Sequence, residues 1–529
     1  MTPFARLPER VAERWPHGVE VRLDVESSRC ELTCRAADLA NVCAWLGDTL
    51  DYTFAGLIVE QQSAAWALRY VFYGALPSAG WVHVLLGAPL ERVSFPTISG
   101  RVRGADWHER EAEDLFELTF EGHPRLGDFV LHNDAWQEGL APMRKTFDAT
   151  AALMHRRPDP DWRPRRIVHA PGAFVMPVGP VYSGIAESAH FQLETVGEDV
   201  IRAFPRLFYG YRAVEKIAEG RSIDNALLLA ERFAATTAFA HGLAYAQAVE
   251  TIGGIDVPPR ARTLRVLLAE LERLRHHAGV IHDICESTAL SVASSQAAIL
   301  EEDLLRLSGA LTGHRYLFGL IAPGGLTRDF DPAEWRQAVA ASRAILARFD
   351  ALEMLLSKTS SFLDRLEEVG IITTEEARAY GLVGPVARAS GVARDLRRAQ
   401  PYADYAACTF DVPQESEGDG YARLRVFFAE ARESVRIMAE TLPALPAGSV
   451  RAERVTIAPG AALGWTEAPR GAAFHWLRIG ERSVVERYRI ASPSFINWHG
   501  FHLAAERFAF QDFPIILASF ALSVTENDR

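Results

Sequence analysis

The stretch ERFAATTAFAHGLAY, residues 231–245, predicts a helix lined with small side chains. The helical pattern around it extends over 222–253. At 3.6 residues per turn, Ala234, Thr237 and His241 occupy positions i, i+3 and i+7 of one face. This face has the small side chains expected around a cofactor, yet it offers the cofactor nothing to bind.

Further helical patterns surround this segment and predict a mainly helical unit. They cover residues 259–289, 332–369, 374–381 and 418–442. The stretch GPVYSGIAESAHFQLETVGEDVI (179–201) predicts two strands joined by a Gly/Ser loop. Near the C-terminus the runs RVTIAP, FHWLRI and VVERYRI predict short strands. Small β elements are therefore expected at both ends of the helical unit.

The first hundred residues have a different pattern, which predicts an α/β unit. Strand-like runs alternate with the helical runs ADLANVCAWLGDTL (37–50) and AAWALRYVFYGAL (64–76). The segment MHRRPDPDWRPRR, with three prolines, cannot continue a helix. We therefore expect an α+β protein with a domain at 1–155, a Pro/Arg linker at 156–168 and a second domain at 169–529.

Length and composition agree with a globular, two-domain chain. Its 529 residues exceed what one core usually supports, and 49% of them are hydrophobic. The net charge of -12, with arginines interleaved, argues against nucleic acid and against a polybasic membrane anchor. The apolar run FPIILASFALSV is about half of the roughly 20 residues that a spanning helix needs. No secretory pattern is found at the N-terminus, so we expect a cytoplasmic protein that reaches a membrane only through partner subunits.

Two common cofactor motifs are not predicted. Cys30 and Cys34 form a lone CxxxC in a strand-like context, to which we assign no metal. No glycine-rich dinucleotide loop follows a strand, so NADH is not expected to bind this chain.

Several motifs resemble a known pair of subunits. WHEREAEDLFELTFEGHP (107–124), followed by W…PMRKTFD (136–148), resembles the C-type subunit of respiratory complex I. In the second domain, four stretches resemble the D-type subunit of complex I and the large subunit of membrane-bound, energy-converting [NiFe] hydrogenases of the formate hydrogenlyase type. These stretches are GPVYSGIAESAHF, RTLRVLLAELERLRHH, GPVARASGVARDLRRAQPYADY and SPSFINW. The order of the two parts on one polypeptide is that of the formate hydrogenlyase large subunit.

The resemblance places two metal-binding CxxC pairs of the hydrogenases on this sequence. The first falls on Ala234 and Thr237, and the second falls on Ser523 and Glu526. Nickel and iron in such a site require soft, bridging thiolates, whereas alanine has no donor atom and a neutral hydroxyl is a poor ligand. We therefore predict that no [NiFe] centre and no other metal is bound here.

The quinone site of the complex I relatives transfers only in part. The resemblance places their quinone-binding tyrosine at Ala235, which cannot donate a hydrogen bond, and Tyr182 where they often have a histidine. Glu526 does agree with complex I. Glu187 and His190, in the strand-connecting loop, are implied as the start of a proton path, with a solvated loop tip as the alternative.

Other residues keep two interpretations each. His241 could shuttle protons near neutral pH, or be a buried ring bonded to a carboxylate or carbonyl. Arg232 is implied near the [4Fe-4S] cluster of a partner, or forms a surface ion pair with Glu231 or Glu215.

Two charged motifs complete the candidate site. Arg394 and Asp395 are expected to form one network that supports the site, with catalysis as a second role. Glu270, Arg273 and His277 make a polar stripe that predicts either a solvated helix face or a contact with a partner protein.

Three functional hypotheses follow from the resemblance. The favoured one is a subunit of the cytoplasmic arm of a membrane-bound, ion-translocating oxidoreductase, which lacks a [NiFe] centre, docks an iron–sulfur small subunit and forms a cavity for an acceptor such as a quinone. The second is a catalytically silent scaffold, expected if Phe233, Phe239 and Phe520 fill that cavity. A true hydrogenase or a standard NADH:quinone oxidoreductase subunit is the third.

Overall fold

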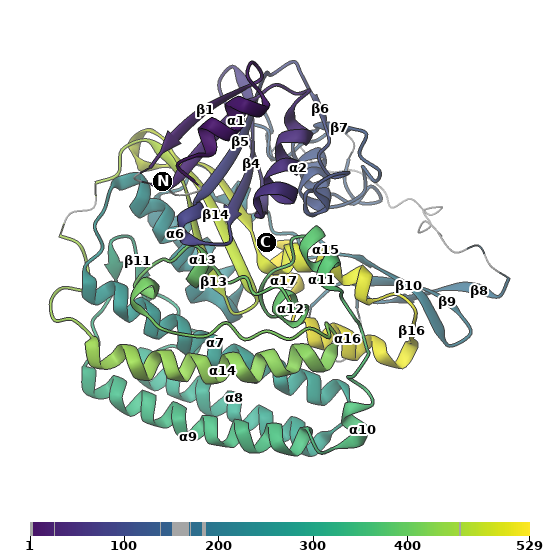
Figure 1. Cartoon of the computed structure of the whole chain (residues 1–529), viewed down its shortest axis with the longest axis vertical. Helices are drawn as coiled ribbons and strands as arrows, with labels where there is room; N and C mark the ends of the chain where they lie inside the picture. The colour runs from purple at the N-terminus through teal and green to yellow at the C-terminus, as the bar shows by residue number, and fades with distance from the viewer. Residues whose placement is uncertain are drawn as a thin grey trace.

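The computed structural model describes residues 4–25, 27–137, 139–150, 169, 171–181, 187–453 and 456–529. The predicted linker 156–168 and Tyr182 lie outside these residues. A sheet-rich N-terminal unit sits on a larger helical unit, as Figure 1 shows, so the α+β prediction is confirmed.

The N-terminal unit is a five-stranded sheet with the strand order β1-β2-β5-β4-β3. Its pairs are antiparallel except for β2 and β5. The strands are β1 Val19–Asp24, β2 Arg29–Cys34, β3 Tyr52–Gln61, β4 Ala65–Gly74 and β5 Trp81–Pro89, and the helices are α1 Leu7–Arg14, α2 Leu39–Leu50 and α3 Asp106–Phe116. Two short strands, β6 Ser94–Pro96 and β7 Thr119–Glu121, pair in parallel.

The helix predicted over 64–76 is wrong, because this segment forms strand β4. Seven consecutive residues of β4, from Leu68 to Gly74, are buried, so both faces of the strand are covered. A strand buried on both faces has a continuous apolar run without alternation, and such a run cannot be told from a buried helix by periodicity.

Helix α3 carries a fully buried glutamate, Glu109, whose chemistry gives a testable pH dependence. It accepts the N–H of Ile98 at 2.8 Å and shares a hydrogen bond with the hydroxyl of Thr97. Burial raises the pKa of Glu109 to about 8. Because the pKa of a glutamate in the unfolded chain is about 4.3, its contribution to stability is complete below that pH and is lost as the pH rises through about 8.

We therefore expect the free energy of unfolding to fall by about 2–3 kcal/mol more between pH 6 and pH 8 in the natural chain than in Glu109→Gln. Glutamine copies the shape and the hydrogen bonding of the neutral acid but does not titrate. Denaturant unfolding at a series of pH values measures this difference. If the free energy of unfolding changes with pH equally in the two proteins, Glu109 is ionised in the folded state.

The helical unit is built on four long helices. Helix α7 Pro259–Ser287 packs against α8 Ser291–Thr312 and α14 Gly420–Thr441, and α9 Pro332–Leu356 packs against α8 and α14. The patterns at 259–289 and 418–442 predicted α7 and α14 closely. Helix α8 was not predicted, and its buried stripe includes small residues such as Ala293 and Ala297, which give little contrast to its polar face. The remaining helices are α4 Val214–Ala218, α5 Ile223–Arg232, α6 Ala238–Gly253, α10 Ser360–Leu363, α11 Thr374–Ala379, α12 Gly384–Ala389, α13 Leu396–Ala399, α15 Pro493–Ala504, α16 Phe513–Phe520 and α17 Val524–Asp528.

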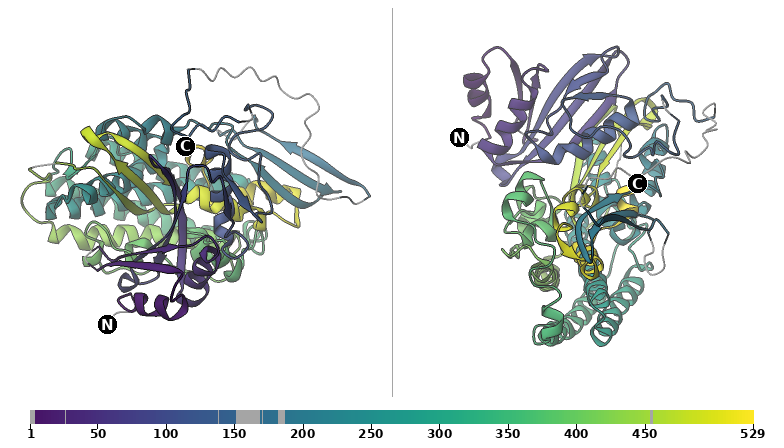
Figure 2. Two further views of the ribbon diagram at one scale, coloured as in Figure 1. Left: turned by 90° about the horizontal axis from the view of Figure 1, so that it is seen from above. Right: turned by 90° about the vertical axis from the view of Figure 1, so that its right-hand side faces the viewer.

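Strands lie at both ends of the helical unit. The antiparallel sheet β13 Gly460–Ala468, β14 Gly471–Ile479 and β15 Val485–Ala491 packs against α6 and against β3 of the N-terminal unit. The predicted strand RVTIAP is wrong for its described residues, 456–459, which precede β13. A second sheet, in the order β16-β10-β9-β8, projects from the body (Figure 2). It consists of β8 Ala173–Val178, β9 His190–Val196, β10 Asp199–Arg206 and β16 Phe508–Ala509, and a small ribbon pairs β11 Ile321–Ala322 with β12 Gly325–Leu326.

The two units share their interior. One apolar cluster includes Trp107 of the N-terminal unit and Phe495 of α15, whose rings are 5.7 Å apart. Buried ion pairs also cross the boundary, among them Glu111 with Arg489 at 2.5 Å. Within the described residues, every helix is too short or too polar to cross a membrane.

Candidate functional site

The segment 231–245 is interrupted, and this interruption forms the centre of the site. Helix α5 ends at Arg232, a 3-10 turn covers Ala235–Thr237, and α6 begins at Ala238. The prediction that Ala234, Thr237 and His241 share one helical face is therefore wrong, because Ala234 has φ -134° and ψ 83°.

A carboxylate distant in the sequence sets the start of α6. Glu272 of α7 accepts the N–H groups of Phe239 at 2.8 Å and Ala240 at 3.0 Å. It thus caps two donors that an α-helix leaves unsatisfied at its N-terminus. Burial raises the pKa of Glu272 to about 7, against the opposing effect of Arg275. Arg275 in turn donates to the carbonyl of Thr236 in the turn.

Three of the four positions at which the resemblance places hydrogenase cysteines are linked by hydrogen bonds. Thr237 Oγ1 donates to Glu526 at 3.4 Å, and Ser523 Oγ accepts the N–H of Glu526 at 3.1 Å. Ala234 is buried beside them in the turn, where its carbonyl accepts the N–H of Thr237. Ser494 of α15 also donates to Glu526.

These residues do not fit a [NiFe] group. They offer two hydroxyls and one carboxylate, and the carboxylate oxygens of Glu526 already accept hydrogen bonds from Thr237, Ser494 and His241. Soft metals that require bridging thiolates have no suitable donor in this set.

Behind Glu526, buried side chains follow one another in a hydrogen-bonded series. His241 Nε2 lies 2.8 Å from Glu526, and His241 Nδ1 lies 2.9 Å from His475 Nε2 on β14. His475 Nδ1 lies 2.7 Å from the hydroxyl of Tyr488 on β15. The relative exposure of all four residues is 0%. His241 therefore is a buried ring bonded to a carboxylate, as the second interpretation expected.

The environment keeps Glu526 ionised. Burial alone would raise the pKa of Glu526, but the hydrogen bond from His241 and the charge of Arg470 outweigh it and lower that pKa to about 2. Burial, with the nearby His241, lowers the pKa of His475 well below its usual value. The series thus joins a carboxylate to a ring that stays neutral.

The two predicted loop residues have different positions. Glu187 accepts the hydroxyl of Ser523 at 2.8 Å and the N–H of Val524, so it is tied to the start of α17 and is not a solvated loop tip. His190 is the first residue of β9, and its Nδ1 lies 3.2 Å from the carbonyl of Gly179. Glu187 therefore joins the site through Ser523, while His190 bonds to its own loop.

Arg232 is exposed, and its guanidinium lies 5.8 Å from the centre of the Phe318 ring. Within the described residues it forms no ion pair with Glu231 or Glu215, so that interpretation is wrong. Glu231 instead accepts the N–H of Gly319, and Glu215 pairs with three buried arginines.

Arg394 and Asp395 do not form one network. Arg394 pairs with Asp51 and donates to Thr53 of the N-terminal unit. Asp395 pairs instead with Arg397 at 2.6 Å, inside the helical unit. Because consecutive residues of an extended segment point in opposite directions, neighbours in the sequence can serve different interfaces.

The predicted solvated stripe is the most deeply buried polar region of α7. Glu270, Arg273 and His277 are at most 1% exposed, so neither the solvated face nor the contact with a partner protein is correct. They belong to a buried charge cluster of four carboxylates and three guanidiniums, which consists of Glu270, Asp395, Glu430, Glu467, Arg273, Arg388 and Arg397, with His277 beside Glu430. Sequence reasoning missed Glu430 and Glu467, because each lies on an element with no local signal of burial.

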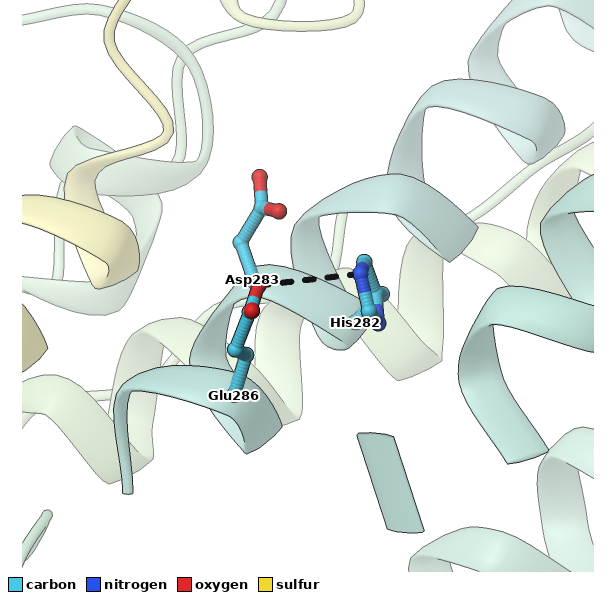
Figure 3. Close-up of side chains that lie close together, drawn as sticks. All are labelled: His282, Asp283 and Glu286. Carbon is cyan, nitrogen blue, oxygen red and sulfur yellow. Dashed lines mark ion pairs between the residues drawn. The ribbon is translucent and has the colours of Figure 1, made fainter. Parts of the chain in front are cut away.

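One further group on α7 has the side chains of a metal site. His282, Asp283 and Glu286 place one potential ligand atom each within 4.8 Å of one another, with an ion pair of 3.8 Å between His282 and Glu286 (Figure 3). The two acids are exposed, and His282 Nδ1 lies 3.0 Å from the carbonyl of Ser294. Exposed acidic groups without a further ligand or a buried, unpaired donor do not define a metal centre.

Comparison with known proteins accounts for both units of the fold. Residues 32–152 match the family of the respiratory-chain NADH dehydrogenase 30 kDa subunit, and residues 295–462 and 452–529 match that of the 49 kDa subunit. The class is therefore a fusion of these two subunit types in one polypeptide.

Individual relatives define this class more closely. The chain is 31% identical to formate hydrogenlyase subunit 5 of Escherichia coli over 469 residues. The matched region covers 88% of this chain and 82% of that protein. It is 30% identical to hydrogenase-4 component G of the same organism, covering 87% and 81%. It is 29% identical to the C/D subunit of NADH-quinone oxidoreductase from Gluconacetobacter diazotrophicus, covering 89% and 85%. The chain belongs to this family of fused C/D-type subunits, which unites complex I and hydrogenase components.

Proposed function

We propose that the chain is the metal-free acceptor-site subunit of a membrane-associated, ion-translocating oxidoreductase. It docks a small subunit with a [4Fe-4S] cluster and, with that partner, forms the place where an acceptor, for which a quinone is our candidate, is reduced. The single observation that carries the proposal is the buried carboxylate of Glu526, which accepts hydrogen bonds from Thr237, Ser494 and His241 next to an exposed face at the helix break.

That face has the composition of a docking surface. Arg232 and Ala235 are exposed, and the rings of His314 and Phe318 stack at 4.3 Å with an angle of 11° between their planes. Arg275 lies 5.0 Å from the partly exposed Tyr316 ring and also holds the turn through Thr236. Aromatic residues and arginine are enriched at the centres of protein interfaces. We call the face formed by Arg232, Ala235, Thr236, His314, Tyr316 and Phe318 the aromatic face.

The names of the relatives support the assembly. Formate hydrogenlyase and NADH-quinone oxidoreductase are multi-subunit redox complexes by name, so a partner subunit that supplies electrons is expected. Membrane subunits that anchor this chain from the inner side are a further part of the proposal. The tie between Glu187 and Ser523 supports coupling, because a change in charge at Glu526 would be transmitted to the Glu187 loop through Ser523.

A second candidate, the catalytically silent scaffold, is favoured by one observation. The Phe233 ring lies over His241, with ring centres 4.5 Å apart, and thus covers part of the site. A cavity of about 360 Å³ lies at the other end of α6 and is lined by Gln247, Arg265 and Tyr402, none of which belongs to the site. Phe520, in contrast, packs beneath Arg423, 4.5 Å from its guanidinium.

The docking of the cluster subunit is tested by Arg232→Glu in the affinity-tagged full chain, expressed in its native host and purified with its complex. Loss of an arginine from the centre of an interface and addition of a like charge weaken binding by about tenfold or more. We expect iron and acid-labile sulfide to fall accordingly, and Arg232→Gln to lower the midpoint potential of the remaining cluster, because a positive charge near a cluster stabilises the added electron.

Arg336 on α9 is also exposed, so Arg336→Glu provides the matched control. We expect this variant to retain the iron and sulfide content and the midpoint potential of the natural complex. A complex that keeps its cluster and its potential in Arg232→Glu contradicts docking at the aromatic face. A short-chain ubiquinone analogue, added to the intact complex after its cluster is reduced, then distinguishes the two functions. A chain with an acceptor site lets the quinone oxidise the cluster, whereas a silent scaffold leaves the cluster reduced.

A further inference from the structure

The series from Glu526 to Tyr488 contains more titratable groups than a structural contact requires. Four ionisable side chains from α17, α6, β14 and β15 make three consecutive hydrogen bonds of 2.7–2.9 Å inside the protein. A buried polar network of this kind is costly unless each member is satisfied. The positions of the protons in it are therefore strongly restricted.

The restriction can be worked out from the carboxylate end. An ionised Glu526 only accepts hydrogen bonds, so His241 Nε2 must carry a proton. If His241 is neutral, its Nδ1 accepts the Nε2–H of His475, and His475 Nδ1 then accepts the hydroxyl proton of Tyr488. Every donor then points toward Glu526.

A second arrangement satisfies the same geometry with one more proton. If His241 carries protons on both nitrogens, its Nδ1–H donates to His475 Nε2, which now accepts. His475 then carries its proton on Nδ1 and donates to the oxygen of Tyr488. The two arrangements differ by one proton on His241 and by the tautomer of His475.

We propose that His241 stores one exchangeable proton against Glu526, and that His475 and Tyr488 form the tautomer switch that allows His241 to hold this proton. The inference rests on the proposed function for its use: when the docked cluster supplies an electron to an acceptor at Glu526, His241 supplies the proton. In that step the Nε2–H bond of His241 breaks, an O–H bond forms on Glu526, and the proton passes to the reduced acceptor. His241 is left neutral with a proton on Nδ1 and none on Nε2, and the uptake of one proton from solvent at Nε2 restores the donor that the carboxylate of Glu526 requires.

Charged groups lie at both ends of the series. Arg470, between β13 and β14, places Nε 4.0 Å from Glu526 and holds Thr236 with its other arm. Glu215 of α4 lies near His475 and Tyr488 and pairs with Arg529 at 3.1 Å. Tyr245 packs edge-on against Tyr488 at 5.5 Å, but its hydroxyl donates to the carbonyl of Ile223. Tyr245 therefore borders the series without belonging to it.

Nitrogen-15 NMR of the full chain with labelled histidine tests the switch without any acceptor. We expect one pH-dependent step in which His241 gains its second proton while His475 changes from the Nε2–H to the Nδ1–H tautomer. In Tyr488→Phe the Nδ1–H of His475 loses its acceptor, so the step should move to lower pH by about one unit, a tenfold loss of proton affinity. Tyr245→Phe, a matched change on the neighbouring ring, should leave the step in place.

A His475 ring that keeps one tautomer across the step, or a step unchanged by Tyr488→Phe, overturns the proposal. The pH profile of quinone reduction by the intact complex distinguishes it from the proposed function. If the natural complex reduces no quinone, the acceptor role fails, while the shared step in the NMR titration still decides whether the switch exists.

Discussion

Replacing Arg388 by methionine will destabilise the folded chain by about 3–5 kcal/mol. Arg388 is 0% exposed and binds two carboxylates directly, Glu430 at 2.6 Å and Glu467 at 2.8 Å, with Asp395 at 3.7 Å. Its loss leaves these carboxylates buried with too few guanidiniums, and an uncompensated buried charge is among the most costly defects in a protein. Denaturant unfolding of the purified chain, or a loss of folded yield, measures this effect.

The control for this change is Arg306→Met on α8. Arg306 also pairs with a glutamate, Glu302 at 2.8 Å, but its side chain is 73% exposed. Exposed pairs of this kind are worth about 0–1 kcal/mol, so the variant should unfold almost like the natural chain. If Arg388→Met lowered the free energy of unfolding as little as Arg306→Met, the expectation would be wrong. The carboxylates of the cluster would then have to become protonated when a guanidinium is removed.

The buried cluster also shows where sequence reasoning stops. A helix face with Glu270, Arg273 and His277 has the pattern of a solvated surface, because charged residues are almost never fully buried unless they are paired. Their partners come from α13, α14 and β13, far along the chain. No local pattern can indicate such pairing. The three residues therefore predict an exposed stripe, although in the structure they lie in the interior.

Secondary structure was predicted well where one face of an element is buried, and less well elsewhere. Helices α2 and α14 followed their patterns. Strand β4 did not, because both of its faces are covered. The start of α6 was missed for another reason, since the cap is supplied by Glu272 of α7 and tertiary contacts override local propensity.

The candidate site was found through the resemblance more than through periodicity. Thr237 and Glu526 lie nearly 290 residues apart, and only the alignment of these positions with the cysteines of relatives predicted that they meet. His475 and Tyr488 were not predicted, because a histidine and a tyrosine on neighbouring strands have no pattern that distinguishes them from core residues. The part of the site that the resemblance could not supply is thus the part on which the proton switch depends.

The contact that aligns the two halves of this switch is Gly464 of β13 against α6. Replacing Gly464 by alanine will cost about 3 kcal/mol and will separate His241 from His475. A Cβ at this position would overlap the carbonyl oxygen of Ala244 and come within 2.8 Å of the N–H nitrogen of Ala248. Both atoms belong to helix backbone, so neither can turn away as a side chain could. The helix must move off the sheet, and the 2.9 Å bond between the two histidines must lengthen.

Gly87→Ala in β5 is the matched control, because the nearest atom to its Cβ would be the carbonyl oxygen of Trp66 at 4.0 Å, an ordinary contact. This variant should retain the stability of the natural chain, since alanine in a strand restricts the unfolded state more than glycine does. Unfolding curves and the histidine NMR titration of the two variants measure both effects. If Gly464→Ala retains the shared titration step of His241 and His475, the sheet and α6 move together, and the alignment of the switch must come from Glu526 and α17 instead.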